Sequence, residues 1–136
     1  MMAEVFVESA DQLSEEYLNT LLGRNDFWAF VALSDGRPVG GLTAHTLPMT
    51  QKEAAEILIY DLAVRASHQR RGIGRALVMA LLDSAAEIGV ESVFVPADSS
   101  DVHALDFYRA LGGVAAPVTL FTFSRSRSRT PVDRTG

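Results

Sequence analysis

The sequence predicts an α/β protein. Three segments carry helix signals, and short apolar runs with strand patterns lie between them. The expected order is helix, hairpin, strand, helix, strand, helix, strand, without an internal repeat. At 136 residues and 48% hydrophobic residues, the chain is expected to bury a real core. We expect residues 1–123 to form a single domain.

Residues 11–22 are predicted to form the first helix. Ser9–Gln12 has the spacing of a capping box in front of it, and Gly23 is expected to end it. One helical face then carries Leu13, Tyr17, Leu18, Leu21 and Leu22. The next two apolar runs, residues 27–33 and 38–45, are separated by the turn sequence SDGR. They are therefore predicted to form a β-hairpin.

Residues 56–64, EILIYDLAV, form a mostly apolar run with two polar breaks. This pattern predicts a central strand that is buried on both faces. An amphipathic helix is expected from Ile73 to Ile88, with Gly89 as its stop signal. The remaining predicted elements are a strand over 90–98, a short Ser-capped helix within 99–113 and a last strand over 117–123.

Charge is distributed unevenly along the chain. The net charge is −5, but residues 1–123 hold eight basic and sixteen acidic residues, a net of −8. An acidic body argues against nucleic-acid binding and favours cationic partners. Residues 124–136, SRSRSRTPVDRTG, are poor in hydrophobic residues, so we expect a disordered basic tail.

Several function classes are disfavoured by composition. No apolar run has the length of a membrane span, so no membrane association is expected. The absence of cysteine excludes disulfides and thiolate chemistry and suggests a reducing cytoplasm. The three histidines do not show metal-ligand spacing, so no metal is expected.

The segment SHQRRGIG, residues 67–74, lies between the predicted strand and the amphipathic helix. Uncapped N–H groups at a helix N-terminus bind anions, and glycines let a phosphate approach the backbone closely. The segment lacks the G-x-x-x-x-G-K-[ST] pattern and is only half of a G-x-G-x-x-G pattern, because Leu77 occupies the last glycine position. From these residues alone, a phosphate site and a plain helix start both remain open.

Residues 69–74, QRRGIG, fit the [QR]-x-x-G-x-[GA] acyl-CoA loop. The chain therefore resembles the GCN5-related N-acetyltransferases. Within them it is most similar to the type I aminoglycoside 3-N-acetyltransferases, over about residues 17–123. That narrower similarity rests on YLNTLLGRNDFWAFVAL, VGGLTAHTLP, EILIYDLAV, HQRRGIGRAL, VFVPAD and ALDFYRALGG.

The resemblance implies a mixed central sheet flanked by helices and acetyl-CoA as the acyl donor. It also implies a homodimer, and a first strand–helix unit that is reduced here to about residues 4–9. The strand before the loop would hold the pantetheine arm through the backbone of Leu62, Ala63 and Val64. The loop would hold the pyrophosphate with Gln69, Arg70, Arg71, Gly72, Ile73, Gly74 and Arg75.

The implied reaction is attack of a neutral amine on a thioester, which needs a group that accepts the amine's proton. Asp61 is the leading candidate, and Asp98 is expected to form an acidic pair with it. Tyr108 matches the tyrosine that protonates the leaving thiolate in many members of the superfamily. Glu56 and Tyr60 are expected to contact the acceptor together with the two aspartates.

Each of these residues also has a purely structural interpretation. Asp61 would then form an ion pair, and Asp98 would serve as a turn or helix-cap acid. Glu56 would be a solvated strand end, while Tyr60 and Tyr108 would be packing aromatics.

The expected acceptor is a polycationic amine, above all the 3-amino group of an aminoglycoside antibiotic, with resistance as the outcome. Polyamines and protein N-termini remain alternatives with the same chemistry. A non-catalytic module that binds acyl-CoA is the alternative from a different class.

Overall fold

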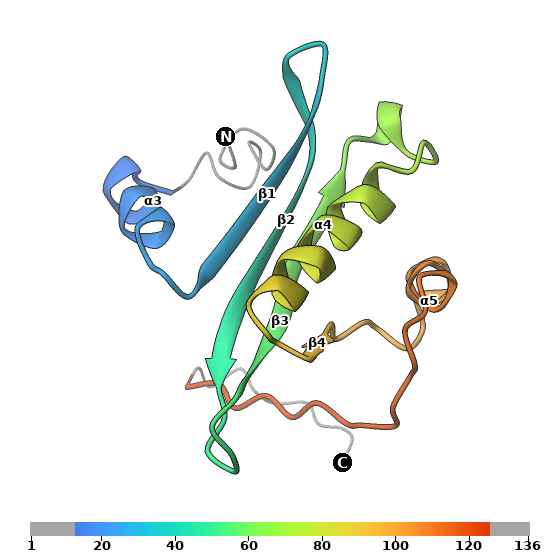
Figure 1. Ribbon diagram of the computed structural model, residues 1–136. Coiled ribbons are helices and arrows are strands. Elements are labelled where there is room, and N and C mark those ends of the chain that lie inside the picture. The colour runs from blue at the N-terminus through green and yellow to red at the C-terminus, as the bar shows by residue number, and fades with distance from the viewer. Residues whose placement is uncertain (1–12, 126–136) are drawn as a thin grey trace. The chain divides into compact units, whose positions relative to one another are not determined.

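A four-stranded mixed sheet organises the computed structural model, which describes residues 13–125 (Figure 1). The strand order is β1-β2-β3-β4, with antiparallel pairing between the first three strands and parallel pairing between β3 and β4. The strand bounds are β1 Phe27–Ser34, β2 Arg37–Pro48, β3 Ala55–Val64 and β4 Ser92–Phe94. The predicted hairpin and the predicted strand at 56–64 are confirmed, and so is the mixed character of the sheet.

The helix α4, Ile73–Glu87, packs against one face of the sheet and forms the core with it. Its inward side chains are Leu77, Val78, Leu81 and Ala85. The two layers approach closely at Gly40 of β2, where a Cβ atom would lie 3.1 Å from Ile73 Cγ2 and 3.2 Å from the carbonyl oxygen of Ala63. Gly89, with φ of +82°, follows the helix as predicted.

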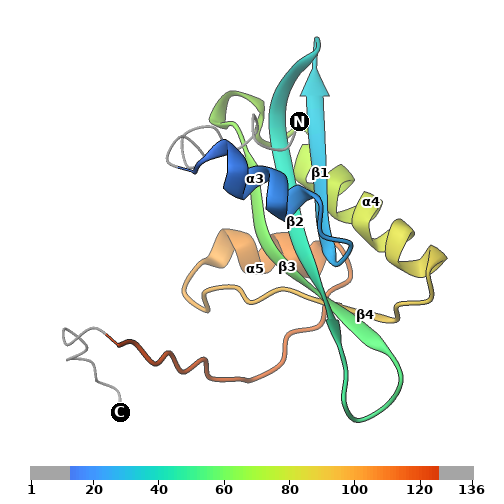
Figure 2. The ribbon, with the colours of Figure 1, turned by 90° about the vertical axis from the view of Figure 1, so that its left-hand side faces the viewer.

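The helix α3, Glu15–Leu22, lies on the opposite side of the sheet from α4 and packs against β1 (Figure 2). The predicted start at Asp11 is wrong, because Leu13 and Ser14 are not helical. Ser14 is the N-cap, and its side chain accepts a hydrogen bond from the backbone N–H of Tyr17. The predicted capping box at 9–12 and the shortened N-terminal unit lie outside the described residues.

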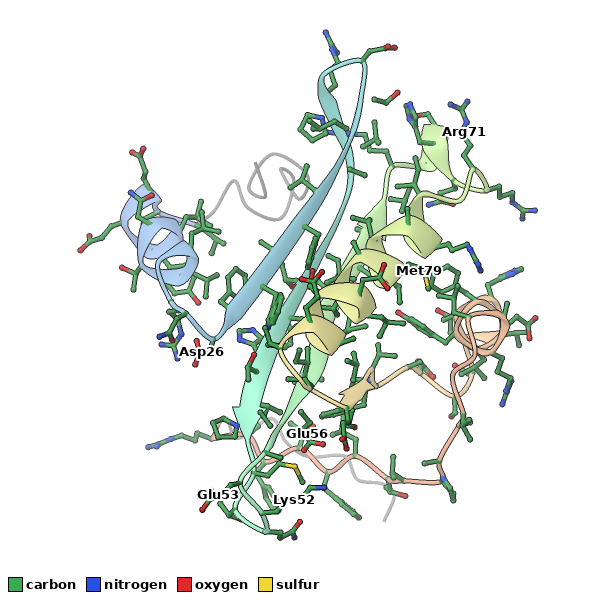
Figure 3. All side chains as sticks on the ribbon, in the orientation of Figure 1. Asp26, Lys52, Glu53, Glu56, Arg71 and Met79 are labelled. Atoms are coloured by element: carbon green, nitrogen blue, oxygen red, sulfur yellow. The ribbon has the colours of Figure 1, made fainter. Side chains whose placement is uncertain are left out.

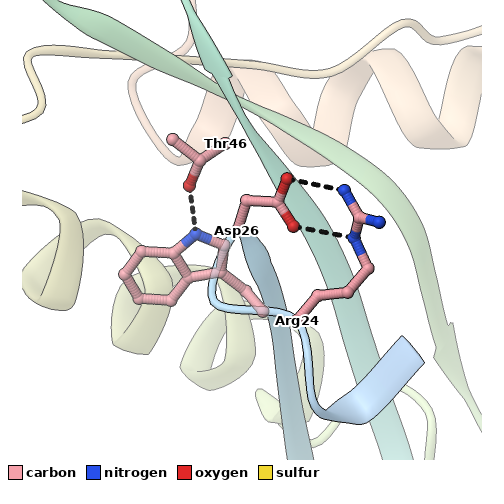
Figure 4. A network of polar contacts seen from close by, with 4 residues as sticks. Arg24, Asp26 and Thr46 are labelled. Carbon is pink, nitrogen blue, oxygen red and sulfur yellow. Dashed lines mark hydrogen bonds and ion pairs between the residues drawn. The ribbon is translucent and has the colours of Figure 1, made fainter. Parts of the chain in front are cut away.

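Two polar contacts fix the start of the hairpin (Figure 4). Arg24 donates two hydrogen bonds of 2.9 Å to the carboxylate of Asp26, and this contact lowers the pKa of Asp26. In the sheet itself, Trp28 Nε1 donates to Thr46 Oγ1 at 2.8 Å across the β1–β2 pair. The half-buried indole N–H therefore has its partner, which offsets the loss of hydration.

The β3–β4 pairing is much shorter than the sequence pattern predicts. β4 pairs with β3 only from Glu56 to Leu58, so the predicted strand over 90–98 is wrong in its length. Pro96 lacks the N–H group that would continue the ladder. The expectation that β3 is buried on both faces is also wrong, because Tyr60, Asp61 and Ala63 are exposed.

The chain divides at Asp101 into two compact units, and the second contains α5, Val102–Ala110. A helix within residues 99–113 is thus confirmed, and it begins at Val102. The predicted strand over 117–123 is wrong: these residues pair with no strand, and Val118 and Phe123 are 84% and 96% exposed. An alternating apolar run forms a strand only against a partner edge.

This structure tests three further expectations only in part or not at all. The expectation of a single domain over residues 1–123 stays a prediction. Most of the predicted basic tail, 124–136, lies outside the described residues. None of the described helices is both long enough and apolar enough to cross a membrane.

Candidate active site

A bulge in β3 places Tyr60 and Asp61 on the same side of the sheet. Thr43 of β2 pairs with Asp61 while Ala44 pairs with Ile59, so Tyr60 is an extra residue on β3. Before the bulge, Ile59 faces α4 and is buried. After it, Leu62 pairs with Leu42 on the same α4 side, so the exposed Asp61 points to the other face.

The second half of β3 has a free edge. β2 covers one edge along the whole strand, but β4 leaves the other edge after Leu58. Among the described residues, no strand pairs with Leu62, Ala63 or Val64 on that side. An extended chain can add to such an edge through backbone hydrogen bonds alone. This is the stretch that the sequence assigns to the pantetheine arm.

The loop after β3 is tied back to the sheet. It contains a short 3₁₀ helix, η1, at Ala66–His68. Gln69 Nε2 donates to the carbonyl oxygen of Val64 at 3.0 Å, and the Arg65 backbone N–H donates to that of Val39 at 2.8 Å. The side-chain amide of Gln69 therefore holds the loop in place, and its predicted contact with a cofactor stays a prediction.

The N-terminus of α4 is open to an anion. Gly72 is the N-cap residue, with φ of +79°, so it supplies no side-chain cap. The first turn holds no acidic residue, which leaves the N–H groups of Ile73, Gly74 and Arg75 without a capping partner among the described side chains. A helix of fifteen residues adds a partial positive charge at this end. Phosphate groups bind in such a setting.

Three arginines surround this helix end. Arg70, Arg71 and Arg75 are exposed, and within residues 13–125 none of them pairs with a carboxylate. Arg70 also has φ of +66°, an uncommon conformation for a residue with a Cβ atom, which is often found at functional sites. Their charge remains available for charge-assisted contacts to a phosphate.

Asp61 carries an exposed carboxylate beside the free edge of β3. Within the described part of the chain, it accepts no hydrogen bond from another side chain and forms no ion pair. The arrangement therefore leaves this carboxylate available to a ligand.

Tyr60 belongs to a row of aromatic rings that crosses three strands. Its side chain is 67% exposed, and its ring meets the ring of His45 edge-on, with centroids 5.6 Å apart. His45 in turn lies 5.2 Å from the ring of Phe27. Sequence analysis missed Phe27 and His45, although the pairing of a two-strand hairpin, once known, brings them opposite each other.

Glu56 lies at the other end of the strand from Asp61. It pairs with Leu47 and is half-buried, on the face opposite α4. Asp61 follows it by five steps along the strand, a distance of roughly 16 Å. Figure 3 shows Glu56 near the β2–β3 turn, far from Arg71 at the start of α4. The structure therefore does not bring Glu56 and Asp61 together.

Asp98 is a turn residue in this structure. Its Oδ1 accepts hydrogen bonds from the backbone N–H of Ser100 at 2.9 Å and from the Ser100 hydroxyl at 2.7 Å. These bonds favour the charged carboxylate and lower the pKa of Asp98. Its predicted pairing with Asp61 stays a prediction.

Tyr108 lies in the second unit, on α5. Its half-buried ring meets the ring of Phe107 edge-on at 5.1 Å, and its carbonyl oxygen accepts a hydrogen bond from Gly113. The predicted catalytic role of its hydroxyl stays a prediction.

Residues 2–112 match the family profile described as "Acetyltransferase (GNAT) family". The match covers the sheet, α4 and α5, including the free edge of β3 and the loop before α4.

Among solved structures, the chain is similar to an aminoglycoside acetyltransferase named meta-AAC0020, which comes from an uncultured soil metagenomic sample. In its complex with sisomicin it is 36% identical, with a TM-score of 0.82 over 92% of this chain and 86% of that chain. Its structure with trehalose gives 37% identity and the same TM-score and coverage.

Two curated relatives are more distant. N-acetyltransferase family 8 member 3 of Mus musculus is 30% identical over 78% of this chain and 46% of its own length. The [ribosomal protein bS18]-alanine N-acetyltransferase of Escherichia coli strain K12 is 29% identical over 76% of this chain and 59% of its own length. The chain thus spans about half the length of the curated relatives it matches.

Proposed function

The chain belongs to the acetyltransferase (GNAT) family, and from this membership we propose that it transfers an acetyl group from acetyl-CoA to an amine of a polycationic small molecule. Aminoglycosides are the proposed acceptors, with the 3-amino group as the site of transfer and resistance as the consequence. The similarity to meta-AAC0020, which was solved with sisomicin, supports this acceptor class.

One observation carries the donor half of the proposal: the free edge of β3 ends at Val64, and the loop 65–72 leads from there to the uncapped N-terminus of α4. Acetyl-CoA has an extended pantetheine arm and a pyrophosphate, and it supplies an activated thioester. The free edge offers backbone groups at Leu62, Ala63 and Val64 to the arm. The N–H groups at the start of α4 and the three arginines offer positive charge to the pyrophosphate.

Asp61 is the proposed proton acceptor. An ammonium group has no lone pair, so the acceptor amine must lose a proton before it attacks a carbonyl carbon. The exposed carboxylate of Asp61 lies next to the free edge, where the thioester end of the donor is expected, and can bind the ammonium and take its proton. The exposed ring of Tyr60 adds a face for a second ammonium group of the same acceptor.

The remaining site residues have proposed roles that rest on the family resemblance. Tyr108 supplies the proton that the leaving thiolate needs, and Asp98 adds negative charge to the acceptor site. Glu56 contacts the acceptor only if the acceptor extends along β3 toward the β2–β3 turn. A homodimer in the cytoplasm, without nucleic-acid or membrane partners, also remains a prediction.

A second candidate acceptor is a protein N-terminus. The similarity to the bS18-alanine N-acetyltransferase favours it. The chemistry at Asp61 would be the same, so an acceptor screen decides between the two.

Acetyl transfer should be measured with sisomicin, spermidine and a peptide that begins with alanine. We expect the highest kcat/KM for sisomicin, and regiochemistry by NMR should place the acetyl group on its 3-amino nitrogen. Turnover of the peptide alone would favour the second candidate. Binding of acetyl-CoA without turnover of any amine would favour the non-catalytic module.

The Asp61→Asn variant tests the proton acceptor. We expect kcat to fall by about 10²- to 10⁴-fold, the range typical for loss of a general base, with acetyl-CoA affinity unchanged. Asp83→Asn, at an exposed carboxylate on α4, is the matched control and should keep full activity. Equal losses in both variants, or a parallel loss of acetyl-CoA binding, would contradict the role of Asp61.

A further inference from the structure

Thr43 holds a buried hydroxyl without a partner. The residue is 7% exposed, and among the described residues nothing forms a hydrogen bond with its Oγ1. Buried hydroxyl groups are almost always paired, because an unpaired one loses its hydration without compensation. An exception in the middle of a central strand therefore needs an explanation.

The pairing of the strands shows which groups surround this hydroxyl. Gly40 of β2 faces α4, so strand alternation places Thr43 on the opposite face, where Asp61 also points. Thr43 lies directly opposite Asp61 on β3 and directly opposite Ala29 on β1. Ala29 has no polar side-chain atom.

Along β2 itself, the neighbours on the same face are Gly41 and His45. Gly41 has no side chain, and the ring of His45 is engaged with the rings of Phe27 and Tyr60. Residues two apart on a strand are also separated by about 6.6 Å, too far for a direct hydrogen bond. Directly opposite residues have Cβ atoms only about 4.5–5.5 Å apart, which brings the Asp61 carboxylate within reach of Thr43 Oγ1.

We propose that Thr43 is a positioning residue for Asp61: when the acceptor is bound, the Thr43 hydroxyl donates a hydrogen bond to the Asp61 carboxylate and holds it toward the amine. The inference rests on the proposed role of Asp61. In this structure the Asp61 carboxylate is exposed to solvent, and Thr43 Oγ1 forms no hydrogen bond with a described residue. A bound acceptor displaces this solvent, and a charge-assisted bond from Thr43 replaces it.

The kinetic test compares Thr43→Val with Thr43→Ser. Valine has the shape of threonine without the hydroxyl, so kcat for sisomicin should fall about tenfold or more while KM for acetyl-CoA stays unchanged. Serine keeps the hydroxyl and should restore kcat to within about threefold of the natural protein. An equal loss in both variants would overturn the inference, because only packing would then be involved.

A double-variant cycle separates this inference from the proposed function. If Thr43 acts through Asp61, Thr43→Val should slow the enzyme only while Asp61 is present, and should have no further effect in Asp61→Asn. An additive loss would overturn the inference alone. If Asp61→Asn by itself leaves kcat unchanged, the proposed proton acceptor is wrong, and the role of Thr43 falls with it.

A stability test requires no activity. Because the hydroxyl of Thr43 is unpaired in the free protein, Thr43→Val should leave the melting temperature unchanged or raise it. Thr46→Val is the matched control: its hydroxyl accepts the bond from Trp28, so this variant should melt at a lower temperature. If Thr43→Val lowers the melting temperature as much as Thr46→Val, the hydroxyl already has a partner, and the inference is overturned.

Discussion

Asp98 shows how the local surroundings of one carboxylate set its contribution to stability. The backbone N–H and the hydroxyl of Ser100 each donate a hydrogen bond to its carboxylate and favour the charged form. The bond from the backbone N–H has the larger effect. Together the two bonds hold the pKa of Asp98 below its usual value of 3.8 in the folded protein. A lowered folded-state pKa stabilises the fold at pH values above 3.8, and this stabilisation is lost as the pH falls through the folded-state value.

The Asp98→Asn variant is therefore expected to melt below the natural protein at pH 7, with a smaller difference near pH 3. Thermal unfolding followed by circular dichroism at the two pH values measures this. Asp83→Asn, on the exposed side of α4, serves as the control and should have little effect at pH 7. A difference for Asp98→Asn that is the same at both pH values would contradict the assigned role of the charge.

At the scale of elements, the start of α4 depends on a backbone conformation that only glycine adopts easily. Gly72 has φ of +79°, and a Cβ atom there would meet nothing within 4 Å. The glycine is thus needed for its conformation and not for space within the protein. Any residue in its place strains the turn that presents the N–H groups of α4.

Two substitutions at Gly72 separate strain from charge. Gly72→Ala should weaken acetyl-CoA binding moderately, about tenfold, since a left-handed residue with a Cβ atom costs roughly 1–2 kcal/mol. Gly72→Glu should weaken it further, because a carboxylate at the helix N-terminus competes with the pyrophosphate. Isothermal titration calorimetry with acetyl-CoA measures both affinities.

Gly36 provides the matched control for these variants. It lies in the β1–β2 turn with φ of +77° and open space around its Cβ position, so Gly36→Ala introduces a comparable strain outside the turn that precedes α4. The Gly36→Ala variant should bind acetyl-CoA as tightly as the natural protein does. An equal loss of affinity in Gly36→Ala and Gly72→Ala would mean that general destabilisation, and not the loop, explains the effect.

At the scale of the whole molecule, the charge of the chain predicts how acceptors respond to salt. A protein with net charge −5 attracts polycations, and salt screens this attraction. The screening length falls from about 10 Å at 0.1 M salt to about 3 Å at 1 M. KM for sisomicin should therefore rise several-fold over this range.

The control for salt dependence is an acceptor with one amino group, for which KM should change much less, because fewer charges interact with the protein. Steady-state kinetics at fixed, saturating acetyl-CoA provide both values. A KM for sisomicin that does not depend on salt would show that the acidic composition has no part in acceptor binding.

Much of the fold follows from local patterns. The hairpin, the strand that becomes β3 and the helix from Ile73 to the stop at Gly89 each have a periodicity or a turn signal within their own residues. The loop before α4 is also found locally, because residues 69–74 fit the acyl-CoA loop pattern, although its glycines alone leave a phosphate site and a plain helix start open. These features depend on residues close in the chain, so one sequence suffices to find them.

The expected strands over 90–98 and 117–123 differ from the structure because each of them depends on a distant partner. The strand β4 is short because β3 pairs with it only from Glu56 to Leu58. The apolar run at 117–123 pairs with no described strand. The capping-box spacing at Ser9–Gln12 predicts an earlier start for α3 than the structure has, because Ser14 forms the N-cap. Strand alternation is a local pattern, so it does not show whether a partner strand is present. A capping signal is also local and does not show which of two candidate residues forms the cap.

The sequence by itself determined the class of the fold, the family resemblance and the loop that is proposed to hold the donor. Only the tertiary structure decided that a bulge at Tyr60 turns Asp61 to the face opposite α4, and that the unpaired hydroxyl of Thr43 lies directly across from it. The reason is physical. A shift of one residue in strand pairing moves every later side chain to the opposite face, and that register is set by contacts between strands far apart in the chain.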